Sequence, residues 1–215
     1  MIRVRVRATT DPARVHPDLS AHQTAIINKC PYLGPSVDRG LTTWSAVEAE
    51  PEDEPALFAL LVEHAEQVRA DRRAYGPLVC HLVALFGPSD DREAKRLMER
   101  PVWVARNLYA PVQIRVDRFW IGVGRRSGPG RSPLPYVPIS YFMVRCGIAN
   151  RDRLIVAARP ADELAALRAG PRDDGREVAH TYLGRSIANV AEAWGELLYA
   201  FPLPSTRSAD GRSAE

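Results

Sequence analysis

An apolar run at residues 78–86 (LVCHLVALF) lies between two Gly-Pro pairs. Such a run is typical of a strand buried on both faces of a sheet. Apolar and polar positions alternate from Val112 to Val116, and the extended character continues to about Val123. After a loop rich in Pro, Gly and Arg, residues 136–148 form another extended pattern. We therefore predict that 78–86 is a central strand, flanked by strands at 112–123 and 136–148.

Three segments carry helical patterns. From Pro55 to Arg73, apolar residues recur on one face, and Pro suits the first helical position because its missing N–H is not needed there. Ser89, Asp90 and Asp91 can cap a second helix that runs to about Glu99, where Pro101 stops or kinks it. The pattern of the last helix consists of Leu183, Ile187, Val190, Trp194, Leu197 and Phe201.

The remaining segments have weaker patterns. Ile2 to Val6 is either a half-buried strand or a basic arm, and residues 11–44 are predicted to be irregular. The acidic run 48–54 is predicted to be a solvated loop, and a short helix is expected at 160–170. The last residues, 205–215, have the composition of a disordered tail.

Helices interleaved with strands predict an α+β fold. We expect one mixed or antiparallel sheet with helices packed mainly on one face. The length of 215 residues suits a single globular domain, placed at 1–204.

Composition narrows the classes of partner. A net charge of +3 is too small to indicate nucleic-acid binding, and no apolar run approaches the roughly 18 residues that span a bilayer. The cysteines, Cys30, Cys80 and Cys146, have no C-x-x-C spacing, which argues against a disulfide framework or a structural zinc site. We therefore expect a protein of the reducing cytoplasm that binds a small-molecule substrate. The sequence leaves open whether the protein forms a homo-oligomer.

The common nucleotide-binding and hydrolytic motifs do not fit. In GVGRRSGPG, a dinucleotide-binding loop would need a third glycine at Ser127 and a helix directly afterwards, but a Pro-rich segment follows. The sequence also lacks G-x-x-x-x-G-K-[ST], H-E-x-x-H and G-x-S-x-G. No residue is therefore assigned a catalytic role.

Arginines gather between residues 100 and 131. Arg106 and Arg131 could hold a carboxylate or phosphate through the planar fork of the guanidinium group. The alternative is a solvated basic loop, because the chain uses arginine in place of lysine almost throughout. Tyr141 could contact a substrate or could simply pack within its strand.

Cys30 and the histidines are the candidate cofactor ligands. His16, His22 and Cys30 could converge on a metal or a heme iron, and Cys30 precedes a proline, as in some heme-thiolate proteins. Each could equally be structural. His81, inside the apolar run, is either hydrogen-bonded in the core or directed into a pocket as ligand or base. His64 and His180 are interpreted as surface residues.

Four short motifs occur in a fixed order: HPDL from His16, CPYLGP from Cys30, VARNLYAP ending at Pro111, and RSPLPYVPISYFMV from Arg131. This arrangement resembles an uncharacterised family of bacterial and fungal domains, often encoded in natural-product gene clusters, and would cover most of residues 15–156. The family commonly has Ile-Arg-His-Met-Val in its last strand, where this chain has Tyr141 and Phe142 in place of Arg-His. The order of elements is also similar to that of small bacterial heme proteins that N-hydroxylate guanidino compounds.

These observations lead to two hypotheses. The first is a small enzyme of specialised metabolism, oxidative and heme-dependent, that acts on an amino-acid-like substrate. Cys30, His81 or His16 would bind the iron, while Arg131, Arg106 and Tyr141 would contact the substrate. The second is a non-catalytic small-molecule-binding or scaffolding protein that uses the Arg/Pro-rich loop 124–138.

Overall fold

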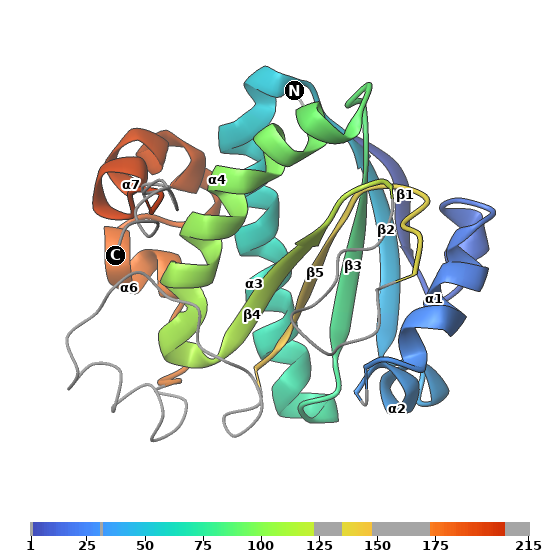
Figure 1. The fold of residues 1–215 in the computed structure, drawn as a ribbon. Coiled ribbons are helices and arrows are strands. Elements are labelled where there is room, and N and C mark those ends of the chain that lie inside the picture. Colours follow the sequence, from blue (N-terminus) through green and yellow to red (C-terminus); the bar gives the residue numbers. More distant parts are fainter. Residues whose placement is uncertain (1, 31, 123–134, 148–172, 205–215) are drawn as a thin grey trace, which may run out of the picture.

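A five-stranded sheet forms the centre of the computed structural model, which describes residues 2–30, 32–122, 135–147 and 173–204 (Figure 1). The strands follow the order β1-β2-β3-β5-β4 across the sheet. Their bounds are β1 Arg3–Thr9, β2 Thr42–Glu48, β3 Cys80–Phe86, β4 Ile114–Phe119 and β5 Tyr141–Cys146. β2 and β3 are parallel and the other neighbours are antiparallel, so the sheet is mixed. The predicted α+β class is confirmed.

The strand predicted at 78–86 is β3, and it lies in the middle of the sheet as expected. β5 pairs with it on one side, but β4 pairs with β5 and forms the edge of the sheet. The other neighbour of β3 is β2, which begins inside the segment predicted to be irregular and takes up the start of the predicted acidic loop. The prediction of an irregular segment missed β2 because Thr42 and Ser45 are buried polar residues, which interrupt the apolar pattern of a central strand.

Helices cover both faces of the sheet, but unequally (Figure 1). The larger core packs one face against α3 (Glu54–Tyr75), α4 (Asp91–Tyr109), α6 (Val178–Leu183) and α7 (Trp194–Ala200). The smaller core packs the other face against α1 (Leu19–Ile27) and α2 (Leu33–Asp38). Short 3-10 turns connect these elements at η1 (Pro12–Arg14), η2 (Pro51–Asp53), η3 (Ala110–Val112) and η4 (Ile187–Ala193). α1, α2 and η1 lie in the segment predicted to be irregular.

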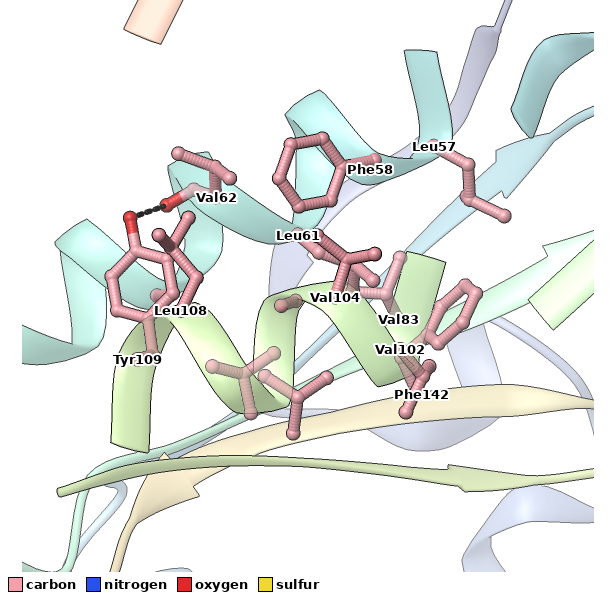
Figure 2. Packing of buried hydrophobic residues seen from close by; sticks show 14 of the residues in the cluster. Leu57, Phe58, Leu61, Val62, Val83, Val102, Val104, Leu108, Tyr109 and Phe142 are labelled. Carbon is pink, nitrogen blue, oxygen red and sulfur yellow. Dashed lines mark hydrogen bonds between the residues drawn. The ribbon is translucent and has the colours of Figure 1, made fainter. Parts of the chain in front are cut away.

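The long helix α3 forms where the apolar periodicity predicted it. Glu50 and Asp53 make a reciprocal capping box immediately before its first turn, and Gly76 ends it with a φ of 85°. Figure 2 shows Leu57, Phe58 and Leu61 of α3 facing apolar residues of α4, with Tyr109 donating a 3.4 Å hydrogen bond to the carbonyl oxygen of Val62. α3 therefore packs against both α4 and the sheet.

The helix α4 does not stop at Pro101. Asp90 caps it as predicted, accepting a hydrogen bond from the backbone N–H of Glu93. Pro101 removes one backbone hydrogen bond. The turns around it bury Leu97, Met98, Val102, Val104 and Ala105, and this apolar burial offsets the lost bond. The helix continues to Tyr109.

The segment predicted to be a single helix from Leu183 to Phe201 contains the last residue of α6, the 3-10 turn η4 and the helix α7. α6 ends at Gly184, which adopts a left-handed φ of 66° that glycine tolerates without strain. The 3-10 turn η4 then leads into α7. Val190, Trp194, Leu197 and Phe201 are nevertheless buried in the larger core, so the apolar pattern did identify the packed face.

Asp173 fastens the C-terminal part of the chain to α3. Its carboxylate accepts hydrogen bonds from Arg69 at 2.5 Å, Arg72 at 2.5 Å and Arg73 at 3.0 Å. Burial opposes the charge of Asp173, but the bonds from Arg69 and Gly175 outweigh it and lower the pKa of Asp173. These charges are partly buried and hydrogen-bonded, so they contribute more than an exposed ion pair.

Two predicted segments, the helix at 160–170 and the tail at 205–215, lie outside the described residues. Among the helices that are described, none combines the length and the apolar character needed to cross a bilayer.

Trp194 provides a test of the larger core. Its indole is buried and lies 5.1 Å from the ring of Phe58, measured between centroids. We expect Trp194→Ala to lower the free energy of unfolding by about 3–5 kcal/mol, because it leaves a cavity where a large apolar side chain packed. Chemical denaturation measures this change. Tyr199→Ala is the matched control on the same helix, since Tyr199 is 90% exposed. Equal effects of both variants would contradict this packing.

Candidate functional site

A group of polar side chains lies between α3 and β3 in an otherwise apolar layer. His64 and Asp71 come from α3, and His81 comes from β3. Seven residues separate His64 from Asp71, so they lie on the same face of α3, two turns apart. Side chains alternate along β3: Cys80 points to the smaller core and His81 to the opposite face, below α3. We call His64, Asp71 and His81 the histidine cluster.

The histidine cluster is joined by short polar contacts. Nδ1 of His64 lies 3.3 Å from Nδ1 of His81, and Nε2 of His81 lies 3.4 Å from a carboxylate oxygen of Asp71. The other oxygen of Asp71 accepts a 2.9 Å hydrogen bond from the amide of Gln67. If His81 donates its Nε2 proton to Asp71, its Nδ1 carries a lone pair that faces His64. The carboxylate thereby sets the tautomer of His81.

Burial keeps both imidazoles neutral. It lowers the pKa of His64 to about 4, and the neighbouring His81 lowers it further. Burial also lowers the pKa of His81, while Asp71 opposes this shift by stabilising the imidazolium. At neutral pH the cluster therefore contains two uncharged rings and one carboxylate. Such neutral, oriented imidazoles can accept protons or bind metal ions.

Ser45 brings a hydroxyl to the same face of the sheet. It lies on β2, next to β3, and is 8% exposed. Its Oγ has no hydrogen-bond partner among the described residues. A buried hydroxyl without a partner is costly, which is one reason such groups occur where a ligand binds. Asp71 has a quarter of its side chain exposed and His64 is half-buried, so the cluster can be reached from the surface.

Part of this cluster was expected from the sequence. His81 was predicted to be either a core histidine or a ligand or base, and in the structure it is hydrogen-bonded beneath α3. His64 was predicted to be a surface residue, but it packs edge-on against His81 with ring centroids 5.5 Å apart. The seven-residue spacing of His64 and Asp71 places both on one face of a helix. It does not show that His81 of β3 lies below that face, which only the structure shows.

The other candidate heme ligands lie elsewhere. Cys30 is on the opposite face of the sheet from His81, where it packs against the smaller core. His16 is partly exposed beyond η1, and its Nδ1 accepts a hydrogen bond from the backbone N–H of Asp18. Cys30 and His81 lie on opposite faces of the sheet, so they could not both bind one heme iron.

The cavity beside Cys30 is small. Its lining includes Cys30, Cys80, Met143 and Arg145, and its volume is about 20 Å³, which is room for about one water molecule. Burial raises the pKa of the Cys80 thiol to about 12, so this sulfur is protonated at neutral pH. Across the described parts of the chain, no three His, Cys, Asp or Glu side chains gather as a metal-binding group.

Of the three residues proposed to contact a substrate, two make contacts within the fold and the third is outside the described residues. Arg106 donates two hydrogen bonds to the carbonyl oxygen of Val116 and one to Asp117, so binding a substrate carboxylate would require it to exchange partners. Tyr141 is 1% exposed and stacks on Phe119. Arg131 and most of loop 124–138 lie outside the described residues.

His22, predicted to be a ligand together with His16 and Cys30, is hydrogen-bonded within the fold. Its Nδ1 lies 2.7 Å from the carbonyl oxygen of Tyr136, and its Nε2 lies 3.1 Å from the hydroxyl of Tyr141. The carbonyl can only accept, so Nδ1 carries the proton and Nε2 accepts from Tyr141. His22 thereby ties α1 to the start of β5, which is a structural role.

No model of a protein family matches the sequence, and comparisons with curated proteins and with solved structures give no significant match. The resemblance to the family of natural-product clusters stays a prediction.

The histidine cluster predicts how stability depends on pH. Below about pH 6.5 the unfolded chain takes up protons at histidine, while the folded chain keeps His64 neutral until its pKa of about 4. The contribution of His64 to the free energy of unfolding is therefore fully present above pH 6.5 and is lost as the pH is lowered towards 4. At about 1.4 kcal/mol per pH unit, His64 contributes at most about 3.5 kcal/mol of this loss.

The measurement is the melting temperature between pH 7 and pH 5, with a chelator present so that bound metal ions do not contribute. We expect His64→Gln to melt with a weaker pH dependence than the native chain. His180→Gln is the control, because His180 is exposed. A native-like slope in His64→Gln would contradict the assignment.

Proposed function

We propose that this chain is a small enzyme of specialised metabolism that acts on an amino-acid-like, small-molecule substrate at the histidine cluster. The observation that supports the proposal most is geometric. A carboxylate contacts one histidine, that histidine contacts a second, and a buried hydroxyl without a partner among the described residues lies on the adjacent strand. A series of this kind can move a proton to or from a bound substrate.

Each residue has a definite part in this proposal. Asp71 fixes the tautomer of His81, and His81 accepts the Nδ1 proton of His64 in a hydrogen bond. Nε2 of His64 is then the ring nitrogen left to take a proton from the substrate. Ser45 would orient a polar group of the substrate.

The class of substrate and the compartment rest on the sequence. The amino-acid-like substrate is proposed with Arg131 and Arg106 as the partners for its carboxylate. The free thiols of Cys30, Cys80 and Cys146 suit a reducing cytoplasm. The rival proposal is a non-catalytic binding or scaffolding protein that uses loop 124–138.

A turnover experiment separates the two proposals. The protein is incubated with a mixture of amino acids and guanidino compounds, with and without a reductant, and each compound is quantified by mass spectrometry. For an enzyme, we expect consumption of one compound far beyond the amount of protein. His64→Gln should slow it by about 10²–10⁴-fold, the usual contribution of acid–base catalysis. His180→Gln should leave the rate unchanged.

A binding protein would give a different result in the same experiment. It would retain up to one equivalent of a compound and release it chemically unchanged. That outcome, unaffected by His64→Gln, would reject the catalytic proposal.

Heme remains the cofactor proposed for an oxidative reaction, with Cys30 or His16 as the ligands nearer the surface. One exchangeable protein ligand suffices for heme iron. The test is the visible spectrum of protein purified from cells supplied with a heme precursor. We expect a stoichiometric Soret band that shifts in Cys30→Ala, His16→Ala or His81→Ala, and the shift identifies the ligand. Colourless protein that also fails to bind added hemin would reject heme.

A further inference from the structure

A surface pocket of about 260 Å³ lies between the start of α3 and the first half of α4, two helices that pack against each other (Figure 1). Glu54 lines it from the first turn of α3, and Arg96 and Arg100 line it from α4. Four residues separate the two arginines, so they lie on the same face of α4, one turn apart. We call this cavity the α3–α4 pocket.

The fold compensates the charges of the α3–α4 pocket only in part. The side chain of Glu54 is 18% exposed, and its Oε2 lies 3.7 Å from Nη1 of Arg100. Burial raises the pKa of Glu54, and the charge of Arg100 and a hydrogen bond from Trp194 offset only part of this shift. Arg96 makes no hydrogen bond or ion pair with another described residue. The pocket therefore presents an incompletely stabilised carboxylate and an available guanidinium group.

Opposite charges in one pocket favour a ligand that carries both signs. An anion without a positive group would meet the negative charges of Glu54 and Glu99, which also lines the pocket. A cation without a negative group would be repelled by Arg96 and Arg100. A molecule with an ammonium group and a carboxylate can pair with both signs at once, through charge-assisted hydrogen bonds.

The remaining lining and the volume indicate a small, partly apolar ligand. Leu97 is buried at the base of α4, and Leu203 is 37% exposed. The indole of Trp103 donates a 3.0 Å hydrogen bond to the carbonyl oxygen of Pro202, which holds the neighbouring Leu203 beside α4. A volume of about 260 Å³ is just below the range of about 300–1,000 Å³ that is typical for drug-sized ligands. An amino acid is small enough for this volume.

From these observations we propose that the α3–α4 pocket binds an apolar α-amino acid. Its ammonium group pairs with Glu54 and its carboxylate with Arg96, while its side chain packs on Leu97 and Leu203. This site goes beyond the proposed function, because it is separate from the histidine cluster. Ten residues of α3 lie between Glu54 and His64, a distance of about 15 Å along the helix axis.

Titration calorimetry with the full chain tests the pocket, with L-leucine, L-methionine and L-phenylalanine as probes. We expect at least one of them to bind at one equivalent and to raise the melting temperature, because it binds the folded state. Its analogues without the ammonium group or without the carboxylate should bind more weakly by about tenfold or more, since each loses a charge-assisted contact. For leucine these analogues are 4-methylpentanoate and 3-methylbutylamine.

Variants assign the two charged contacts. Arg96→Gln should weaken binding of the amino acid by about tenfold or more. Arg92→Gln is the matched control, because Arg92 is exposed on the same helix and does not line the pocket. Glu54→Gln keeps the size of the side chain. It should weaken the amino acid but strengthen the analogue without an ammonium group, whose carboxylate is no longer repelled. Circular dichroism verifies that each variant folds.

Two results would overturn the proposal: no saturable binding of any of the three probes, or binding that is unchanged in both Arg96→Gln and Glu54→Gln. His64→Gln separates this inference from the proposed function, because it should bind the amino acid as the native chain does. Binding that is lost in His64→Gln would place the ligand at the histidine cluster and reject the α3–α4 pocket. Binding through Arg96 without turnover of any compound would retain the pocket and reject the enzyme.

Discussion

β3 is buried on both faces, and the rest of the structure depends on which of its side chains faces which core. Cys80, Leu82 and Ala84 pack in the smaller core, whereas Val83 and Leu85 pack in the larger one. His81 shares the face of Val83 because strand side chains repeat every two residues. A slip of one residue would exchange the two sets and bury His81 among the aromatic rings next to α1. The register with β2 and β5 therefore places the polar chemistry beneath α3.

α3 is held firmly enough to place a site because polar contacts complement its apolar packing. Glu66 accepts hydrogen bonds from Arg69, from the hydroxyl of Tyr109 and from the backbone N–H of Val178. Arg69 is 2% exposed and also binds Asp173, so removing one partner would leave a buried charge uncompensated. This network joins α3, α4 and the C-terminal segment. Its effect is to fix the rotation of α3, and with it the direction in which His64 and Asp71 point.

The sequence predicted the elements whose patterns are local and left out what depends on packing. β3, α3 and the Asp90 cap follow from an apolar run, a helical period and a capping residue. The strand β2 was missed because Thr42 and Ser45 are polar although buried, and the extent of α4 because burial outweighs the cost of Pro101. The site was harder still. His64 and His81 meet only through the placement of α3 over β3, and 17 residues separate them without any recognisable spacing.

The two faces of the sheet differ in the chemistry that they can support. On the α1 side, the aromatic and sulfur-containing side chains close around a cavity of about 20 Å³, and burial keeps the Cys80 thiol protonated. Its polar groups are engaged with each other, as His22 and Tyr141 show. On the α3 side, neutral imidazoles lie beside a partly exposed carboxylate, and the hydroxyl of Ser45 has no partner among the described residues. The α3 side thus combines polar groups within reach of solvent with a buried hydroxyl that has no partner among the described residues, and the proposed proton transfer is therefore assigned to that side.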